Sequence, residues 1–258
     1  MTLPPLPQLG GLSPKETTTP LRVVVLASGN GSNLQVMIDA MNAGVLPIKI
    51  VGVICNVKDA YALMRAAEAG IDTAIFSHIL TGENAGKRMD IKTFERHAKF
   101  KLNQWQPDLI VLAGFMRVLS GDFINASPAP MINLHPSLLP AYKGLDTHAR
   151  AIEAGERLHG CSVHVVTAEL DAGQVLTQAL LSIRTNDTAE SLQARVQELE
   201  HQLLPWTILL IANGMIPQTA LTSTGVEKGV TDAAITDSPM PTLPLRLWLD
   251  DQVLQTSV

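Results

Sequence analysis

The chain has 258 residues, of which 46% are hydrophobic and 17% charged, and its formal net charge is −5. This length suits one large domain or two small ones, and the balance is typical of a soluble globular protein with a sizeable core. The acidic charge argues against a nucleic-acid substrate, and no apolar run approaches the length of a membrane span. The two cysteines, Cys55 and Cys161, offer neither a disulfide framework nor metal-ligand spacing, which favours a cytoplasmic setting.

Residues 1–20 contain five prolines and no periodic apolar pattern. They lack the basic start and the apolar core of a signal peptide. We therefore expect a disordered N-terminal extension.

From residue 21, apolar runs that predict strands alternate with amphipathic runs that predict helices. Strands are expected at 21–27, 48–55, 73–76 and 108–113, with helices after the first strand and at 60–69 and 90–104, and a polar loop at 77–88. Near-continuous apolar runs are typical of parallel strands that are covered on both faces. The alternation predicts an α/β fold: a Rossmann-like, mostly parallel sheet with helices on both faces.

The second half of the chain is expected to continue into a C-terminal part with antiparallel strands and a long helix. Strands are predicted at 161–166 and 175–181, a helix at 147–154, and the long helix from about 187 to 214 with a kink at Pro205. Residues 216–258 are rich in Thr and Pro, with one apolar cluster at 243–249. They predict an extended or loosely packed C-terminal extension, which leaves 21–215 as the catalytic domain.

A glycine-rich turn connects the first predicted strand to the first predicted helix. Its sequence is Ser28-Gly29-Asn30-Gly31-Ser32-Asn33. Such a turn offers free backbone N–H groups and a positive helix end, so it is a ready anion site. Leu34 stands where a dinucleotide fingerprint has its third glycine, and no Lys-Ser/Thr pair follows as in a P-loop. A monophosphate therefore fits better than a dinucleotide, and a tight turn without a ligand is the alternative.

Asn133 and His135 stand at the end of an apolar run, just before Pro136. Pro136 favours extended backbone, so both side chains are expected on one face. An amide that donates to a carbonyl oxygen and an imidazole that moves protons suit acyl transfer. The alternative is a turn-capping Asn133 and a satisfied core histidine. The glycine turn, 114–117 and 133–135 all follow predicted parallel strands, whose carboxyl ends bind ligands, so we expect them in one site.

Three further polar residues are candidates for this site, although each has a non-functional explanation when it is considered alone. Asp171 precedes Ala-Gly in a polar loop, where a turn residue is the alternative. Gln197 and Glu200 are three apart on one stripe of the long helix and can reach the same ligand; a solvated face is the alternative.

Four segments of the chain, in order and with similar spacing, closely resemble the phosphoribosylglycinamide formyltransferases, the folate-dependent glycinamide ribonucleotide transformylases of purine synthesis. These segments are 28–35, 112–117, 133–140 and 170–173. The His-Pro-Ser-Leu-Leu-Pro block marks the wider formyltransferase superfamily. The Gly-Asn-Gly-Ser-Asn turn together with Gly-Phe-Met-Arg singles out this family, and the resemblance covers roughly 21–215.

The resemblance implies transfer of the formyl group of 10-formyltetrahydrofolate to glycinamide ribonucleotide by a monomer or homodimer, without a metal, nucleic acid or membrane. It implies that the ribonucleotide is bound by Gly31, Ser32, Asn33, Gln197 and Glu200. It implies a folate pocket formed by Met116, Arg117, Val118, Leu119 and Asn133, with Lys92 as a basic contact.

The family's catalytic residues match Asn133, His135 and Asp171. Asn133 and protonated His135 are expected to stabilise the oxyanion, while Asp171 raises the pKa of His135. His135 then gives its proton to the departing folate nitrogen. The rival hypotheses are a formyltetrahydrofolate hydrolase, a methionyl-tRNA formyltransferase and a non-catalytic phosphate-binding module.

Overall fold

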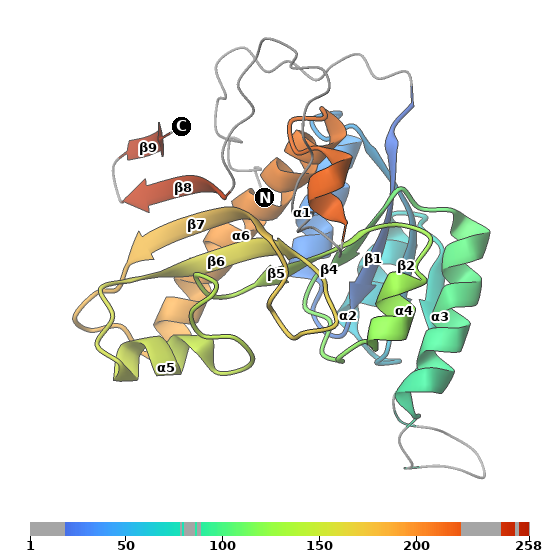
Figure 1. Cartoon of the computed structure of the whole chain (residues 1–258), viewed down its shortest axis with the longest axis horizontal. Coiled ribbons are helices and arrows are strands. Elements are labelled where there is room, and N and C mark those ends of the chain that lie inside the picture. The colour runs from blue at the N-terminus through green and yellow to red at the C-terminus, as the bar shows by residue number, and fades with distance from the viewer. Residues whose placement is uncertain are drawn as a thin grey trace, which may run out of the picture.

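The computed structural model describes residues 19–77, 79, 86, 89–222, 244–250 and 253–257. Within these residues, nine strands form one mixed sheet in the order β3-β2-β1-β4-β5-β6-β7-β8-β9 (Figure 1). The strands from β3 to β5 pair in parallel, and β6 and β7 follow as antiparallel neighbours. This confirms the predicted fold class. Almost all of the N-terminal extension and most of the 77–88 loop lie outside the described residues.

The first half alternates strands and helices as expected, with bounds that differ from the predictions by at most one residue. Its elements are β1 (Leu21–Ala27), α1 (Ser32–Asn42), β2 (Ile48–Cys55), α2 (Tyr61–Glu68), β3 (Thr73–Ile75), α3 (Ile91–Trp105), β4 (Leu109–Leu112), α4 (Gly121–Asn125) and β5 (Met131–His135). The short helix α4 was not predicted. Ser120 caps its start: the Ser120 hydroxyl accepts a hydrogen bond from the backbone N–H of Phe123.

The second half contains the predicted antiparallel strands and long helix. Its elements are α5 (Thr147–Glu153), β6 (Leu158–Val165), β7 (Val175–Ser182), α6 (Ala189–Ala212), the 3₁₀ helix η2 (Gln218–Leu221), β8 (Leu245–Asp250) and β9 (Val253–Ser257). Thr188 caps α6 together with Ser191, and the helix continues through Pro205. Strand β6 starts three residues earlier than predicted, because the antiparallel pairing with β7 extends to Leu158.

The predicted C-terminal extension contributes two strands to the sheet. Strand β8 pairs in parallel with β7, from Thr177–Leu245 to Leu180–Trp248, and β9 returns antiparallel to β8. Without β8, the edge of β7 would leave backbone N–H and C=O groups unpaired. The extended segment β8 provides hydrogen-bond partners for them. The domain boundaries at 21 and 215 stay predictions.

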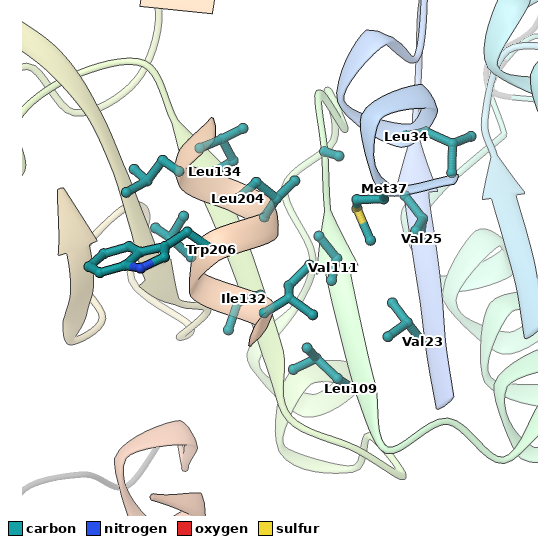
Figure 2. Close-up of a cluster of buried hydrophobic side chains, with 14 of the residues drawn as sticks. Val23, Val25, Leu34, Met37, Leu109, Val111, Ile132, Leu134, Leu204 and Trp206 are labelled. Carbon is teal, nitrogen blue, oxygen red and sulfur yellow. The ribbon is translucent and has the colours of Figure 1, made fainter. Parts of the chain in front are cut away.

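The core lies on both faces of the sheet. Strand β1 sends Val23 and Val25 to the face covered by α1 and α6, and Val24 and Leu26 to the face covered by α3 and α4. Figure 2 shows the first of these layers, in which Leu204 of α6 lies close to the strand side chains. Burial on both faces explains the continuous apolar runs.

Candidate active site

The segments after β1 and β4 are joined by hydrogen bonds at the carboxyl edge of the sheet. Ser28 donates its backbone N–H to the Gly114 carbonyl oxygen over 3.1 Å. The Ser28 hydroxyl accepts the Met116 backbone N–H over 2.8 Å and donates to Asn56 Oδ1 over 2.5 Å. The glycine turn and the 114–119 segment are therefore held side by side, as the carboxyl ends of parallel strands predict.

Gly31 occupies a position that only glycine fits. Its φ of 72° is left-handed, and an added Cβ would lie 2.7 Å from the Cβ of Ala62. Gly31 begins α1, which has no side-chain cap. The N–H groups of the first helical turn have no acceptor within the helix, so they are available to an anion.

Two side chains of α6 reach the glycine turn. Gln197 Nε2 donates to Ser32 Oγ over 3.0 Å, and Asn33 Nδ2 donates to Glu200 Oε2 over 3.0 Å. Burial raises the pKa of Glu200, although the bond from Asn33 opposes this effect. The structure thus brings together the residues predicted to bind the ribonucleotide.

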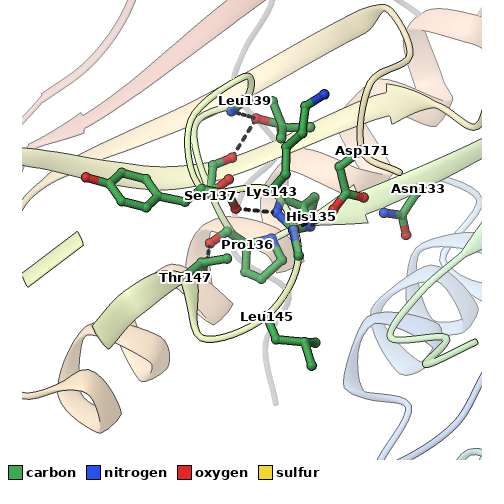
Figure 3. Close-up of polar contacts among 12 residues, drawn as sticks. Asn133, His135, Pro136, Ser137, Leu139, Lys143, Leu145, Thr147 and Asp171 are labelled. Carbon is green, nitrogen blue, oxygen red and sulfur yellow. Dashed lines mark hydrogen bonds and ion pairs between the residues drawn. The ribbon is translucent and has the colours of Figure 1, made fainter. Parts of the chain in front are cut away.

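The three predicted catalytic residues lie together at the carboxyl end of β5, which carries Asn133 and His135, while Asp171 comes from the loop between β6 and β7 (Figure 3). The nearest oxygen of Asp171, Oδ2, lies 3.5 Å from His135 Nδ1. His164 connects the remaining pair: its Nε2 lies 3.6 Å from Asp171 Oδ1 and 3.1 Å from Asn133 Nδ2. Amide, carboxylate and imidazoles therefore form one continuous buried polar cluster.

Asp171 is held in an unusual conformation. Its φ of 48° is left-handed, which is uncommon for a residue other than glycine. Its Oδ2 accepts the Gly144 backbone N–H over 2.9 Å. Burial raises the pKa of Asp171, but the interactions with His164, Gly144 and His135 outweigh burial, and the net shift is downward. The carboxylate is therefore ionised at neutral pH.

The pKa of His135 departs from the prediction. Burial is the largest effect and lowers this pKa, with smaller contributions from the charges of His164 and Arg150; the Tyr142 carbonyl and the Asp171 charge raise it, and the net shift is downward. The sign of the Asp171 effect is as expected, but in the free protein burial opposes the protonation of His135 that the sequence predicts. His135 Nε2 lies 3.0 Å from the Tyr142 carbonyl oxygen, which only accepts, so Nε2 carries the proton and Nδ1 is free to take another.

The cluster lies at a cavity of about 620 Å³, lined by residues that include Asn133, His135, His164, Asp171 and the segment Met116 to Leu119. Met116 and Val118 are 69% and 65% exposed, which gives the cavity apolar side chains at its mouth. The Arg117 side chain also contacts the segment that leads into α3: its Nη2 donates to the Met89 carbonyl oxygen over 3.0 Å.

Lys92 does not line this cavity. It lies exposed in the first turn of α3, whereas the neighbouring Phe94 and Glu95 face the core. Lys92 is therefore outside the described cavity, and its folate contact stays a prediction.

Sequence analysis missed His164, Gly144 and Tyr142. Of these, only His164 had a detectable signal: a histidine inside an otherwise apolar strand, which antiparallel pairing sets directly opposite Asn133. The contributions of Gly144 and Tyr142 are made by backbone atoms, which no side-chain pattern reveals.

Among the residues described, no group of three or more His, Cys, Asp or Glu side chains is arranged to hold a metal ion. In the same part of the chain, no helix combines the length and the apolarity needed to cross a membrane.

Comparison with known proteins defines the class. Residues 21–208 match the formyl transferase family model, so the chain belongs to this family. The phosphoribosylglycinamide formyltransferase of Escherichia coli strain K12 is 41% identical over 196 residues, which cover 76% of this chain and 89% of the relative. The enzyme of the same name from Haemophilus influenzae is 40% identical over 195 residues, with 76% and 89% covered.

Solved structures agree with these relatives. The phosphoribosylglycinamide formyltransferase of Coxiella burnetii, in complex with CHES, has 47% sequence identity and a TM-score of 0.68, covering 76% of this chain and 89% of that one. Glycinamide ribonucleotide transformylase 1 of Symbiobacterium toebii has 36% identity and the same TM-score of 0.68, again with 76% and 89% covered. Within the wider family, the chain is thus a formyltransferase of the phosphoribosylglycinamide formyltransferase group.

Proposed function

We propose that this enzyme transfers the formyl group of 10-formyltetrahydrofolate to the amine of glycinamide ribonucleotide, in de novo purine biosynthesis in the cytoplasm. The observation that carries the proposal is the buried cluster of Asn133, His164, Asp171 and His135 at the wall of the 620 Å³ cavity. The names of the relatives in the same family support the choice of substrates.

The glycine turn binds the ribonucleotide phosphate. The N–H groups of Gly31, Ser32 and Asn33 begin α1, where the helix dipole favours an anion. Asn33 Oδ1 is buried and has no hydrogen-bond partner among the described residues, which suits a ligand that donates to it. Gln197 and Glu200 extend the site toward the glycinamide side through their bonds to Ser32 and Asn33.

The cavity beside the catalytic cluster receives the folate. The backbone of residues 116 to 119 and the Asn133 side chain line it, and the exposed apolar groups of Met116 and Val118 suit a planar ring system. The two substrates then meet at the edge where Ser28 joins the glycine turn to the 114–119 segment.

The reaction needs an oxyanion donor and a group that moves one proton. The amine attacks the formyl carbon, a C–N bond forms, and the carbonyl π electrons move to oxygen, where Asn133 donates an amide N–H. The amine loses a proton, and neutral His135 accepts it at Nδ1. The resulting imidazolium faces Asp171 Oδ2 at 3.5 Å. His135 then passes this proton to the folate nitrogen as the bond between that nitrogen and the formyl carbon breaks.

A lowered pKa suits this role for His135. In the free protein the ring is neutral at pH 7 and ready to accept a proton, because burial disfavours its charged form. Asp171 stabilises the charged form only once the proton arrives. The carboxylate thus lowers the barrier to proton uptake without keeping His135 protonated beforehand.

A spectrophotometric assay of formyl loss from 10-formyltetrahydrofolate, with and without glycinamide ribonucleotide, tests the proposal. Wild type is expected to release the formyl group only with the ribonucleotide, and His135→Ala to abolish release. His97→Ala, which removes an exposed histidine of α3, is the matched control and is expected to retain activity. Release of the formyl group without the ribonucleotide would indicate a hydrolase. Transfer of the formyl group to charged initiator tRNA would indicate a tRNA formyltransferase. Folate binding without release would indicate a non-catalytic module.

A further inference from the structure

Arg65 of α2 is bonded to the glycine turn through three separate N–H donors. Its Nε donates to the Asn30 carbonyl oxygen over 2.9 Å, and its Nη2 donates to Asn30 Oδ1 over 3.0 Å. Its Nη1 donates to Gln35 Oε1, in the first turns of α1, over 3.0 Å. One guanidinium therefore spans the turn and the start of the helix that follows it.

The rest of α2 packs against the same turn. Ala62 donates its backbone N–H to the Gly29 carbonyl oxygen over 3.1 Å, and its side chain lies under Gly31. The Arg65 guanidinium carbon lies 4.6 Å from the centre of the Tyr61 ring, a cation–π contact within α2. The Arg65 side chain is thus oriented by Tyr61, a residue of the same helix.

The charge of Arg65 also extends to α6, which carries the other side of the ribonucleotide site. The pKa of His201 is lowered, first by burial and then in part by the charge of Arg65. His201 directly follows Glu200, which contacts Asn33 of the same site. Arg65 does not line the folate cavity.

We propose that Arg65 is a positioning residue that sets the affinity for the ribonucleotide phosphate by holding Asn30 and the start of α1 in the phosphate-binding geometry. The inference rests on the proposed function of the glycine turn. The N–H groups of residues 31 to 33 converge on one point only if the preceding backbone is fixed, and Asn30 is the residue that Arg65 fixes at two atoms.

The three acceptors require an arginine. The planar fork of a guanidinium donates in several fixed directions, whereas the compact ammonium of lysine reaches one or two acceptors on a flexible stem. The effect should be confined to the ribonucleotide, since Arg65 contacts neither the catalytic cluster nor the 116–119 segment in any bond described.

The experiment compares Arg65→Ala, Arg65→Lys and Arg96→Ala in the full chain. Arg96 is exposed on α3, and its replacement changes the net charge by the same amount. Arg65→Ala is expected to raise KM for glycinamide ribonucleotide about tenfold, with kcat and the KM for folate within about twofold of wild type. Arg65→Lys is expected to recover less than half of this loss, and Arg96→Ala to behave as wild type.

An unchanged KM for the ribonucleotide in Arg65→Ala would overturn the inference. Full recovery by Arg65→Lys would also overturn it, since charge alone would then suffice. If Arg65→Ala does not fold, Asn30→Ala takes its place, because it removes one acceptor and leaves Arg65 intact; a KM equal to wild type would count against the proposal. Calorimetric titration with the ribonucleotide distinguishes the role of Arg65 from the proposed reaction. If the ribonucleotide binds Arg65→Ala more weakly than wild type, the role of Arg65 is supported. If wild type nevertheless shows no turnover, the proposed reaction is refuted.

Discussion

Asn133 and His164 face each other across β5 and β6, and the amide Nδ2 of Asn133 donates to His164 Nε2 over 3.1 Å. The other ring nitrogen of His164, Nδ1, lies 2.9 Å from the Val165 carbonyl oxygen and must donate to it. In the neutral ring Nε2 is then an acceptor, and the Asn133 amide turns its NH2 end toward His164. His164 therefore orients the amide, and the second N–H of that amide is left for the substrate.

His164→Leu removes this acceptor at similar volume. We expect kcat to fall by about tenfold or more, because a misdirected amide no longer donates to the oxyanion. His164→Gln can still offer an oxygen to Asn133, so it should recover part of the loss. Steady-state kinetics of both variants test this; equal activity of His164→Leu and wild type would contradict the orienting role.

Asp171→Asn should lower kcat by about a hundredfold and also shift the pH profile. The Asp171 charge raises the pKa of His135, so its removal must lower that pKa further below the ordinary value of about 6.5. If neutral His135 accepts the proton, kcat/KM rises with pH through this pKa and then stays level. The acidic limb of the variant should therefore lie at lower pH than that of wild type; a limb at higher pH would refute the assignment.

The sequence predicted the parallel half of the fold well because its signals are local. A strand such as Leu21–Ala27 is buried on both faces and reads as a continuous apolar run. The convergence of the glycine turn, residues 114–117 and Asn133 followed from the rule that parallel strands end at one edge. The addition of β8 to the sheet was not predictable, since it depends on a free edge of β7 that no local pattern reveals.

Electrostatics was the weakest part of the prediction. The sign of the Asp171 effect on His135 was correct, but the burial that outweighs it depends on the packing around the site. The role of Lys92 stays a prediction: its position relative to the cavity depends on the rotation of α3, where the exposed and buried sides differ by one or two residues.

Histidines buried behind the catalytic segment should make the protein sensitive to acid. Burial, followed by the nearby charge of His148, lowers the pKa of His159 to about 4, and its Nε2 lies 3.1 Å from His148 Nδ1. At a pH between this folded-state pKa and the unfolded-state pKa of about 6.5, the unfolded chain binds more protons than the folded protein. The contribution of His159 to the free energy of unfolding is therefore complete above pH 6.5 and is lost as the pH falls. We expect Tm to fall by about 5 °C between pH 7 and pH 5.

His159→Asn tests the origin of this loss, because asparagine can hydrogen bond but does not titrate in this range. The difference in Tm between pH 7 and pH 5 should become smaller in the variant, whatever its stability at pH 7. Calorimetric melting curves at the two pH values measure it. A pH difference as large as that of wild type would assign the acid sensitivity to other groups.

Gly31 tests whether the phosphate turn depends on its contact with α2. Gly31→Ala should destabilise the fold by about 2 kcal/mol and weaken ribonucleotide binding, because the new methyl group would lie 2.7 Å from Ala62 Cβ at a left-handed φ. Gly70→Ala is the matched control: its φ of 67° carries the same backbone strain, but no atom lies within 4 Å of the added Cβ. The clash persists whatever the side chain at 62, because the added Cβ would also lie 2.8 Å from the Ala62 Cα. Calorimetric melting curves of the two variants measure the loss of stability. A loss in Gly31→Ala no larger than that in Gly70→Ala would mean that the left-handed backbone, and not the contact with α2, is what the fold requires of residue 31.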